Sequence, residues 1–460
     1  MKKIGWGMPV LFYCTALLLL FCKTSQLFTF DYDQEFYAYE YIKIATQHKL
    51  TLLGMETSVG GLFVGPLYTY FSSIVYWLAN GSPMGMFVVT LLIAAAQPAL
   101  TYLLFRRLSQ DRRVGVIGGL LVLFSVSLWS KAYAPSVIIF LYPSGLLFWY
   151  ILTKLPTNKT YILWLGLLLG ISFHLHFSLF LFIPIVFVFI FLKKLSRFIG
   201  ARKIIGTFLL VILFISPFVM FDLRHNFLLL KNIVGFMTQQ TYAADQLTIP
   251  HHLGGVFQSA FDTFTHAVTV RQSVFAQVVV FSTVLFAIIK RRKYSGMESA
   301  LVMWGVTFFL FLLYHGGRPD YYFFFLLPAF FYCLAIFSNS VRPLFFRATL
   351  YIFLVFSWGN NLLAMSKAYN PYNYFIKSEA VSYIKSQTQV KAVKILYDTD
   401  LGLSFGFKYL LDFVGVNQDL SKYEAVYQIV LRPNNHLAGK EFRIPNSPNA
   451  IFVVKLPNTL

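Results

Sequence analysis

Long apolar runs, separated by short polar stretches, fill the first 364 positions of the chain. Because an α-helix rises about 1.5 Å per residue, roughly 20 apolar residues cross a hydrocarbon core about 30 Å thick. The runs that are long enough to cross a membrane, or nearly so, lie at residues 6–22, 84–105, 114–130, 135–153, 161–192, 204–221, 273–289, 298–314, 321–338 and 344–364. This pattern predicts a polytopic α-helical membrane protein.

Two of the apolar runs need interpretation. Residues 161–192 would form a single helix of about 48 Å, which is too long for one crossing. A break at HLHF, residues 174–177, predicts a hairpin of two spans instead. Residues 62–79 are also long enough to cross, but they would then place the basic segment 106–113 outside, against the excess of Lys and Arg in cytoplasmic loops. We therefore expect residues 62–79 to lie along the outer surface of the membrane.

The distribution of charge supports about eleven spans, with the N-terminus in the cytoplasm and the C-terminus outside. With this topology the inner segments carry 19 Lys or Arg residues against only Asp111 and Glu298, which accounts for most of the net charge of +20. Nucleic-acid binding is not expected, because the basic residues do not share one face with stacking aromatic residues. Composition agrees, since 57% of the residues are hydrophobic and only 12% are charged. The predicted location is the plasma or inner membrane.

Three segments are predicted to lie on the outer side of the membrane. They are a first loop at 23–83 with short interfacial helices, a second loop at 222–272, and a tail from 365. In the tail, helix-like SEAVSYIKSQ and LSFGFKYLLDFV alternate with strand-like KAVKILYD, AVYQIVL and NAIFVVKL. This alternation predicts a small α/β domain at 365–460 that follows a transmembrane module at 1–364.

Acidic residues gather in FDYDQEFYAYEYIKI, residues 30–44, just after the first predicted span. On a helix Asp31 and Glu35 share a face, whereas Asp33 points elsewhere. A solvated loop is one interpretation. However, aromatic neighbours at a membrane boundary can desolvate a carboxylate and change its basicity. We therefore expect at least one of these acids to be functional.

A second polar group, Asp222, Arg224 and His225, stands at the outer end of the predicted span 204–221. Arg suits bidentate binding of phosphate, and a neighbouring His adds a second donor. We expect this group to bind a phosphate. The alternative is an Arg side chain that extends to the membrane interface with Asp222 as its counter-ion.

Two further outward elements carry candidate residues. His174 and His176 mark the turn of the predicted hairpin. A His on an apolar face is usually a packing residue, which we expect for His174, whereas His176 is closer to the outer surface and is assigned near the substrate. The segment HGGRPDYYFF, residues 315–324, offers Arg318 as another cation and Tyr321 near the substrate, or is an ordinary aromatic belt.

Four motifs share this predicted outer location: FDYDQEFYAYEYI, GGLFVGPLYTYF, GISFHLHFSLFLFIP and PFVMFDLRHNF. In their order they resemble the acidic first-loop motif, the interfacial helix, the His-bearing hairpin and a further bacterial segment of one family. That family is the polytopic GT-C glycosyltransferases of the protein O-mannosyltransferase and aminoarabinose-transferase type, which use polyprenyl-phosphate sugars. The resemblance covers most of the membrane part and implies a GT-C fold.

The resemblance implies roles for individual residues. The catalytic acid of the family falls on Asp33, with Glu35 and Asp31 beside it. Tyr68 and Tyr70 fall on the helix that borders the lipid donor. The three acids are therefore the candidate catalytic residues, and the two tyrosines are candidate donor-binding residues.

The chain departs from the family pattern at two places. Val64 and Gly65 stand where the family usually has Lys or His before the first Pro, which weakens the case for phosphate binding by this loop. The segment KAYAPS, residues 131–136, lacks the Asp that some relatives place there. We therefore expect no metal cofactor, while Mg²⁺ or Mn²⁺ bound by the acid cluster stays open.

The expected activity is inverting transfer of a hexose or pentose, in the manner of a mannosyltransferase, from a polyprenyl-phosphate donor. The acceptor is a lipid, glycan or protein at the outer face. Asp33 would be the general base, and Arg224 and His225 would stabilise the departing phosphate. Two alternatives remain. A flippase or transporter would place paired charges or broken helices near the bilayer midplane, and a cell-envelope glycan polymerase or ligase would use large outer loops richer in Arg.

Overall fold

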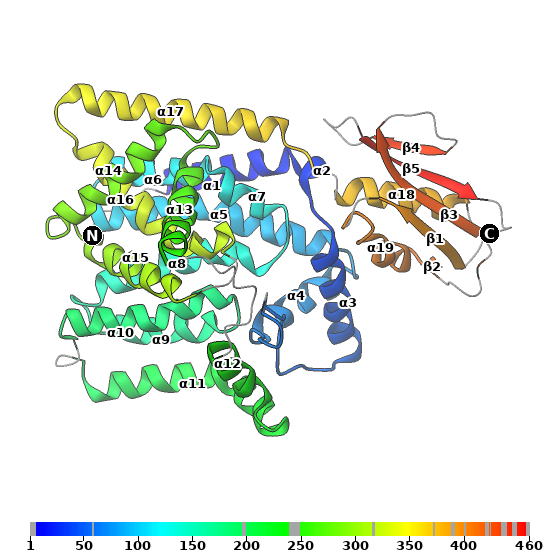
Figure 1. Cartoon of the computed structure of the whole chain (residues 1–460), viewed down its shortest axis with the longest axis horizontal. Helices are drawn as coiled ribbons and strands as arrows, with labels where there is room; N and C mark the ends of the chain where they lie inside the picture. Colours follow the sequence, from blue (N-terminus) through cyan, green and yellow to red (C-terminus); the bar gives the residue numbers. More distant parts are fainter. Residues whose placement is uncertain are drawn as a thin grey trace.

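The computed structural model describes residues 6–57, 59–195, 199–238, 249–314, 318–370, 373–387, 392–399, 402–418, 423, 425–433, 439–443 and 449–456. These residues form a bundle of helices and, at one end of it, a small domain built around a sheet (Figure 1). We call this end the domain end of the bundle.

Each apolar run that was predicted to cross the membrane is helical. In chain order the helices are α1 (Gly7–Phe21), α5 (Met84–Ser109), α6 (Arg112–Leu123) with α7 (Val126–Ala132), η1 (Val137–Phe140) with α8 (Leu141–Lys154), α9 (Tyr161–Ser172), η2 (Phe177–Leu181) with α10 (Phe182–Leu192), α11 (Ala201–Arg224), α14 (Val274–Lys290), α15 (Met297–Leu312), η4 (Asp320–Leu326) with α16 (Leu327–Ser340), and α17 (Leu344–Lys367).

Within the described ranges, five of these segments are long and apolar enough to cross a membrane, namely α5, η1 with α8, α11, η4 with α16, and α17. The pair α6 and α7 gives a sixth crossing if its bend of 55° lies within one span. The other predicted spans are shorter apolar helices: α1, α9, η2 with α10, α14 and α15. The chain is a polytopic α-helical membrane protein, as predicted.

The structure shows how the two ambiguous runs fold. Residues 161–192 are divided between α9 and η2 with α10 by a turn that contains His174. Residues 62–79 contain only the 12-residue helix α4 (Leu67–Leu78). Helix α9 has the same length, so length alone does not decide whether α4 crosses the membrane, and the interfacial position of residues 62–79 stays a prediction. Helix α4 lies with α3 (Tyr32–Gln47) between the bundle and the sheet domain (Figure 1).

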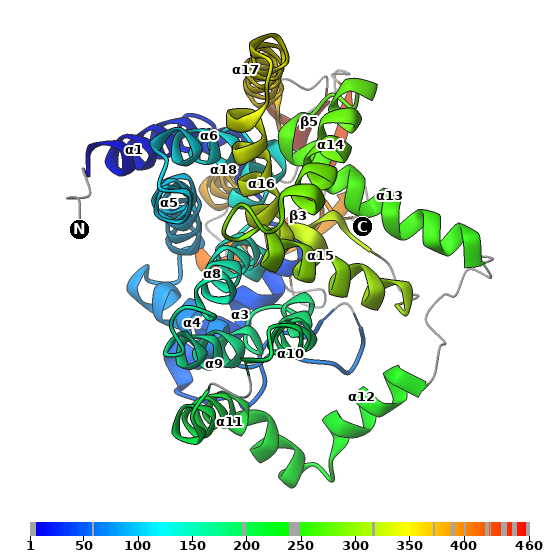
Figure 2. The same cartoon turned by 90° about the vertical axis from the view of Figure 1, so that its left-hand side faces the viewer.

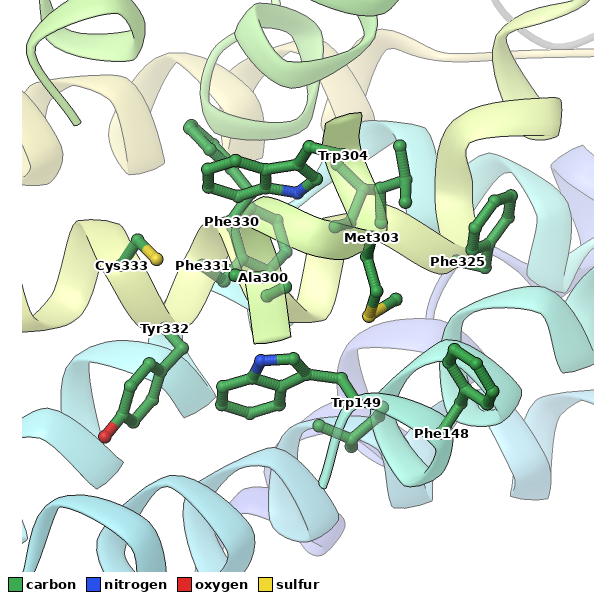
Figure 3. Packing of buried hydrophobic residues seen from close by; sticks show 14 of the residues in the cluster. Phe148, Trp149, Ala300, Met303, Trp304, Phe325, Phe330, Phe331, Tyr332 and Cys333 are labelled. Atoms are coloured by element: carbon green, nitrogen blue, oxygen red, sulfur yellow. The ribbon is translucent and has the colours of Figure 1, made fainter. Parts of the chain in front are cut away.

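Aromatic side chains fill the centre of the bundle around α16. Trp149 of α8 has its ring centroid 4.7 Å from that of Tyr332, and its Nε1–H donates to the Gly296 carbonyl at 2.9 Å (Figure 3). Phe148 stacks on Phe182 with 3.7 Å between ring centroids. By contrast, α11 lies at the edge of the bundle (Figure 2), and most of its apolar side chains face outward. Such a face suits contact with lipid.

The C-terminal domain is a mixed sheet with two helices against it. Its strands lie in the order β2-β1-β3-β5-β4, in which β1 is parallel to β2 and β3, and β5 is antiparallel to β3 and β4. The elements are α18 (Tyr374–Gln387), β1 (Ala392–Asp398), α19 (Phe407–Phe413), β2 (Asn417–Gln418), β3 (Ala425–Pro433), β4 (Lys440–Arg443) and β5 (Asn449–Leu456). The predicted α/β domain is present, and the short strands β2 and β4 had too few residues to show a pattern.

Further helices cover the domain end of the bundle. Asn232 donates from Nδ2 to the Gly61 carbonyl at 2.9 Å and so joins the second predicted loop to the first. Residues 239–248 of the second loop lie outside the described residues. The described helices of this layer, besides α3 and α4, are α2 (Thr24–Leu27) and α12 (Leu228–Thr238), whereas α13 (Ile249–Val268) packs against η4, α14 and α15 in the bundle.

Candidate active site

A cavity of about 510 Å³ lies between α3, the first loop and the bundle ends formed by η1, η2 and η4. Apolar side chains such as Phe36 and Val137 form part of its wall. The polar lining residues are Tyr32, Asp33, Tyr37, Glu40, Thr51, Glu56, Thr57, Thr69, Ser136, His176 and Tyr322. The cavity is large enough for a sugar phosphate, and pockets of this size commonly bind small ligands.

Helix α3 places Asp33 in this wall. The helix begins at Asp31, whose backbone N–H donates to Gln34 Oε1 at 3.3 Å as half of a capping box. From there Asp33, Tyr37 and Glu40 follow at spacings of four and three residues, which brings them to one face of the helix. This face of α3 forms part of the cavity wall. Burial there raises the pKa of Asp33.

Asp33 also borders a smaller chamber of about 40 Å³ next to the main cavity. This chamber is lined by Tyr41, Tyr68 and Tyr76. A water occupies roughly 10–15 Å³ on this measure, so the chamber holds only a few waters. The carboxylate of Asp33 thus stands between a substrate-sized space and a space for a few waters, which is a suitable position for proton transfer.

The other two predicted catalytic acids face the C-terminal domain. Glu35 is 9% exposed, and its Oε1 accepts the Tyr409 backbone N–H at 2.9 Å. Burial raises the pKa of Asp31, and the positive charge of Lys377 opposes this shift. Within the described part of the chain, Asp33 is the member of the trio that lines the main cavity.

His176 lines the cavity opposite α3 as a neutral hydrogen-bond donor. Its Nδ1 accepts the Ser178 backbone N–H at 3.1 Å, which leaves the ring proton on Nε2. Burial lowers the pKa of His176 to about 4, so the ring is neutral at physiological pH. The imidazole of His176 packs in T-shaped contacts with the rings of Tyr321 and Tyr322, with 5.6 and 5.4 Å between ring centroids.

His174 has a structural position instead. Its Nδ1 accepts the Leu67 backbone N–H at 3.3 Å, and its Nε2–H donates to the Phe214 carbonyl at 2.8 Å. A Cβ at Gly65 would lie 2.1 Å from this ring, so the close approach requires Gly at that position. His174 therefore joins the start of α4 to α11.

The predicted phosphate-binding group lies beside the cavity, at the end of α11. Both carboxylate oxygens of Asp222 accept backbone N–H groups, from Leu229 at 2.7 Å and Leu230 at 3.1 Å, so this acid caps the start of α12. Arg224 and His225 are exposed at the same helix end. None of these three side chains is among the described residues that line the cavity. Their role in phosphate binding stays a prediction.

The remaining predicted residues are distributed around the site. Nη1 of Arg318 lies 3.4 Å from His252 Nδ1, outside the cavity lining given by the described residues. Gly316 and Gly317 of the same motif lie outside the described residues. Tyr70 donates its hydroxyl to the Thr51 carbonyl and holds the first loop on α4.

Two charged residues near the site were not singled out from the sequence. Glu56 lines the cavity and accepts the Gly61 backbone N–H at 2.7 Å. Lys131 lies behind the wall, 3.5 Å from Asp320 Oδ1 and 5.4 Å from the Tyr321 ring centroid. The isolated basic residue in KAYAPS was the available signal for Lys131, whereas the sequence around Glu56 has no pattern that marks it.

An apolar groove of about 180 Å³ adjoins the cavity between η2 and α15. Phe177 and Tyr322 belong to the walls of both spaces. The other groove residues are Ser178, Phe180, Leu181, Leu310, Phe311 and Tyr314. Within the described part of the chain there is no group of three or more His, Cys, Asp or Glu placed to hold a metal ion.

The helix bundle and the sheet domain at one end of it form the GT-C fold of polytopic membrane proteins. The structure of ArnT from Cupriavidus metallidurans bound to undecaprenyl phosphate is similar over 98% of both chains, with a TM-score of 0.61 and 9% sequence identity. The apo structure of the same protein gives a TM-score of 0.60 at 10% identity, again over 98% of both chains. The predicted GT-C fold is thus confirmed.

No protein-family model matches the chain, and comparison with curated protein sequences gives no match.

Proposed function

We propose that the protein is a membrane glycosyltransferase that moves a sugar from a polyprenyl-phosphate donor to an acceptor at the outer face of the plasma or inner membrane. The observation that carries this proposal is the carboxylate of Asp33, which borders both a sugar-sized cavity that adjoins an apolar groove and a small chamber beside that cavity. A protein of the same fold was solved with undecaprenyl phosphate bound, which supports a lipid of this class as the donor.

The two adjoining spaces suit the two parts of such a donor. The sugar and its phosphate would occupy the polar cavity, and the first units of the lipid chain would lie in the groove behind Phe177 and Tyr322. The Nε2–H of His176 would donate to a phosphate oxygen. Lys131 would add positive charge near the leaving phosphate, supported by its position beside Tyr321.

The reaction is a single displacement at the anomeric carbon. Asp33 takes the proton of the acceptor hydroxyl as the oxygen bonds to that carbon. The bond between the carbon and the phosphate oxygen breaks, and the polyprenyl phosphate leaves with the electron pair. Because one displacement occurs, the configuration at the anomeric carbon inverts.

Replacement of Asp33 tests this proposal. Asp33→Asn keeps the side-chain volume but cannot accept the proton, so transfer should fall by about 10²- to 10⁴-fold. The measurement uses purified protein and a panel of labelled polyprenyl-phosphate sugars, with Asp262→Asn on α13 as the matched control that keeps wild-type rates. If wild-type protein transfers no sugar from the panel, or Asp33→Asn stays within a few-fold of it, the proposal is wrong.

The pH profile gives an independent readout of the same residue. A general base works only when ionised, and burial raises the pKa of Asp33. The rate should therefore decrease as the pH falls through this raised pKa, at a higher pH than for an ordinary Asp of pKa about 3.9.

A further inference from the structure

Helix α3 has a second face, which is in contact with the C-terminal domain (Figure 1). Asp31, Glu35 and Tyr39 are spaced four residues apart and so form one stripe along the helix. The hydroxyl of Tyr39 donates to Asp412 Oδ2 at 2.5 Å, and Lys408 Nζ donates to the same oxygen at 2.9 Å. Asp33, which faces the cavity, and Glu35, which faces the C-terminal domain, thus lie within the same two turns of α3.

Glu35 holds the start of α19. The first N–H groups of a helix have no partner within the helix, and they carry partial positive charge. Tyr409 is the third residue of α19, and its N–H donates to Glu35 Oε1 at 2.9 Å. A carboxylate from α3 therefore caps a helix of the other domain.

Lys377 of α18 joins the same two helices from the other side. Its side chain is fully buried, with Nζ donating to the Phe30 carbonyl at 2.8 Å and to the Phe405 carbonyl at 2.6 Å. Phe30 directly precedes Asp31, the N-cap of α3, and Phe405 directly precedes Gly406, the N-cap of α19. One amino group therefore fixes the chain at the start of both helices.

The two hydrogen bonds that Lys377 donates do not depend on the charge of its amino group near neutral pH. Burial lowers the pKa of Lys377 to about 7, while the carboxylates of Asp31 and Glu35 oppose this shift. Both the charged and the neutral amine can donate the two hydrogen bonds.

We propose that Glu35 and Lys377 are positioning residues, through which the C-terminal domain holds the first turns of α3 so that Asp33 faces the reacting atoms. The inference rests on the proposed role of Asp33 as general base. Its physical basis is that a catalytic group displaced by about 1 Å can cost about 10²-fold in rate. Contacts of the C-terminal domain on one face of α3 would therefore affect the rate of transfer at Asp33 on the other face.

A pair of substitutions at Glu35 separates positioning from direct catalysis. Glu35→Gln keeps an oxygen that accepts the Tyr409 N–H, so kcat should stay within about threefold of wild type. Glu35→Ala removes the acceptor, and kcat should fall on the order of 10²-fold while KM for the donor changes by less than about threefold. If Glu35→Gln is as inactive as Glu35→Ala, Glu35 acts through its charge and the positioning role is overturned.

Lys377→Met tests the second residue, because Met has a similar length and cannot donate. We expect the same fall in kcat with little change in KM, whereas Lys385→Met, on the exposed side of α18, keeps wild-type kinetics. Rates are normalised to the protein that binds undecaprenyl phosphate. Wild-type kcat in both Lys377→Met and Glu35→Ala overturns the proposal. If Lys377→Met does not fold, the Glu35 pair decides.

Asp33→Asn in the same assay separates the two proposals. An active Asp33→Asn protein contradicts the general base, and with it the reason for positioning. An inactive Asp33→Asn protein together with fully active Glu35→Ala and Lys377→Met proteins overturns the positioning role alone.

Discussion

Asp33 and Glu35 carry the same chemical group two positions apart, yet α3 directs them to different surroundings. Asp33 lines a cavity, and Glu35 accepts a backbone N–H from the other domain. The helical period predicted this separation, because positions i and i+2 lie on different faces. Because Asp33 and Glu35 both carry a carboxylate, the difference between their roles comes from the groups that surround each side chain.

A prediction at the residue scale concerns metal. Asp33, Glu40 and Glu56 are the acids among the described cavity-lining residues, and Mg²⁺ commonly uses one or two carboxylates with phosphate oxygens. A monophosphate leaving group needs less charge neutralisation than a diphosphate, so we expect the transfer rate to be unchanged in excess EDTA. Complete loss of activity that is restored by Mg²⁺ or Mn²⁺ would show that these acids bind a metal and would require a different base.

At the scale of elements, short helices and tight turns decide how the bundle ends are arranged. The helix α4 has 12 residues because it follows Pro66 and ends before Asn80 and Gly81, whose φ angles are 51° and 82°. Its start is tied to α11 through His174. Local turn chemistry therefore limits the apolar run at 62–79 to a helix of 12 residues.

A close helix contact gives a prediction at this scale. A Cβ at Gly145 of α8 would lie 2.1 Å from the Phe325 carbonyl oxygen of η4, so Gly145→Ala should lower stability by about 1–3 kcal/mol. Gly305 of α15 is the matched control, because nothing lies within 4 Å of a Cβ built there. Thermal unfolding in detergent should show a lower Tm for Gly145→Ala and an unchanged or higher Tm for Gly305→Ala. Equal Tm values would contradict the close α8–η4 contact.

At the scale of the whole molecule, the bundle carries the candidate site at one end, and the C-terminal domain is held against the opposite face of α3. The long-range contacts between them include the hydrogen bonds that the Tyr409 N–H donates to Glu35 and that Lys377 Nζ donates to the Phe30 carbonyl. The basic residues concentrate in the segments predicted to lie at the opposite side of the membrane, which is the usual arrangement for cytoplasmic loops.

This topology predicts where each end of the chain lies. A reporter that is active only in the cytoplasm should be silent when fused after Leu460, because the C-terminal domain is predicted to lie outside. The same reporter inserted after Tyr294, in a predicted inner segment, should be active. The reverse pattern would invert the topology and place the candidate site in the cytoplasm.

The sequence by itself determined the helices of the bundle, the division of residues 161–192 and the longer strands of the C-terminal domain. It also separated Asp33 from the face of Asp31 and Glu35. These features follow from hydropathy, turn residues and the helical period, which are properties of neighbouring positions. The fold class therefore follows from local patterns along the chain.

Only the tertiary structure decided which polar residues meet. Glu35 and Tyr409 are 374 positions apart, and no local pattern marks either residue as the partner of the other. Asp222, predicted beside a phosphate, caps α12, and Glu56, with no signal in the sequence, lines the cavity. Periodicity gives the face on which a side chain lies, but the packing of distant elements decides what occupies the space in front of that face.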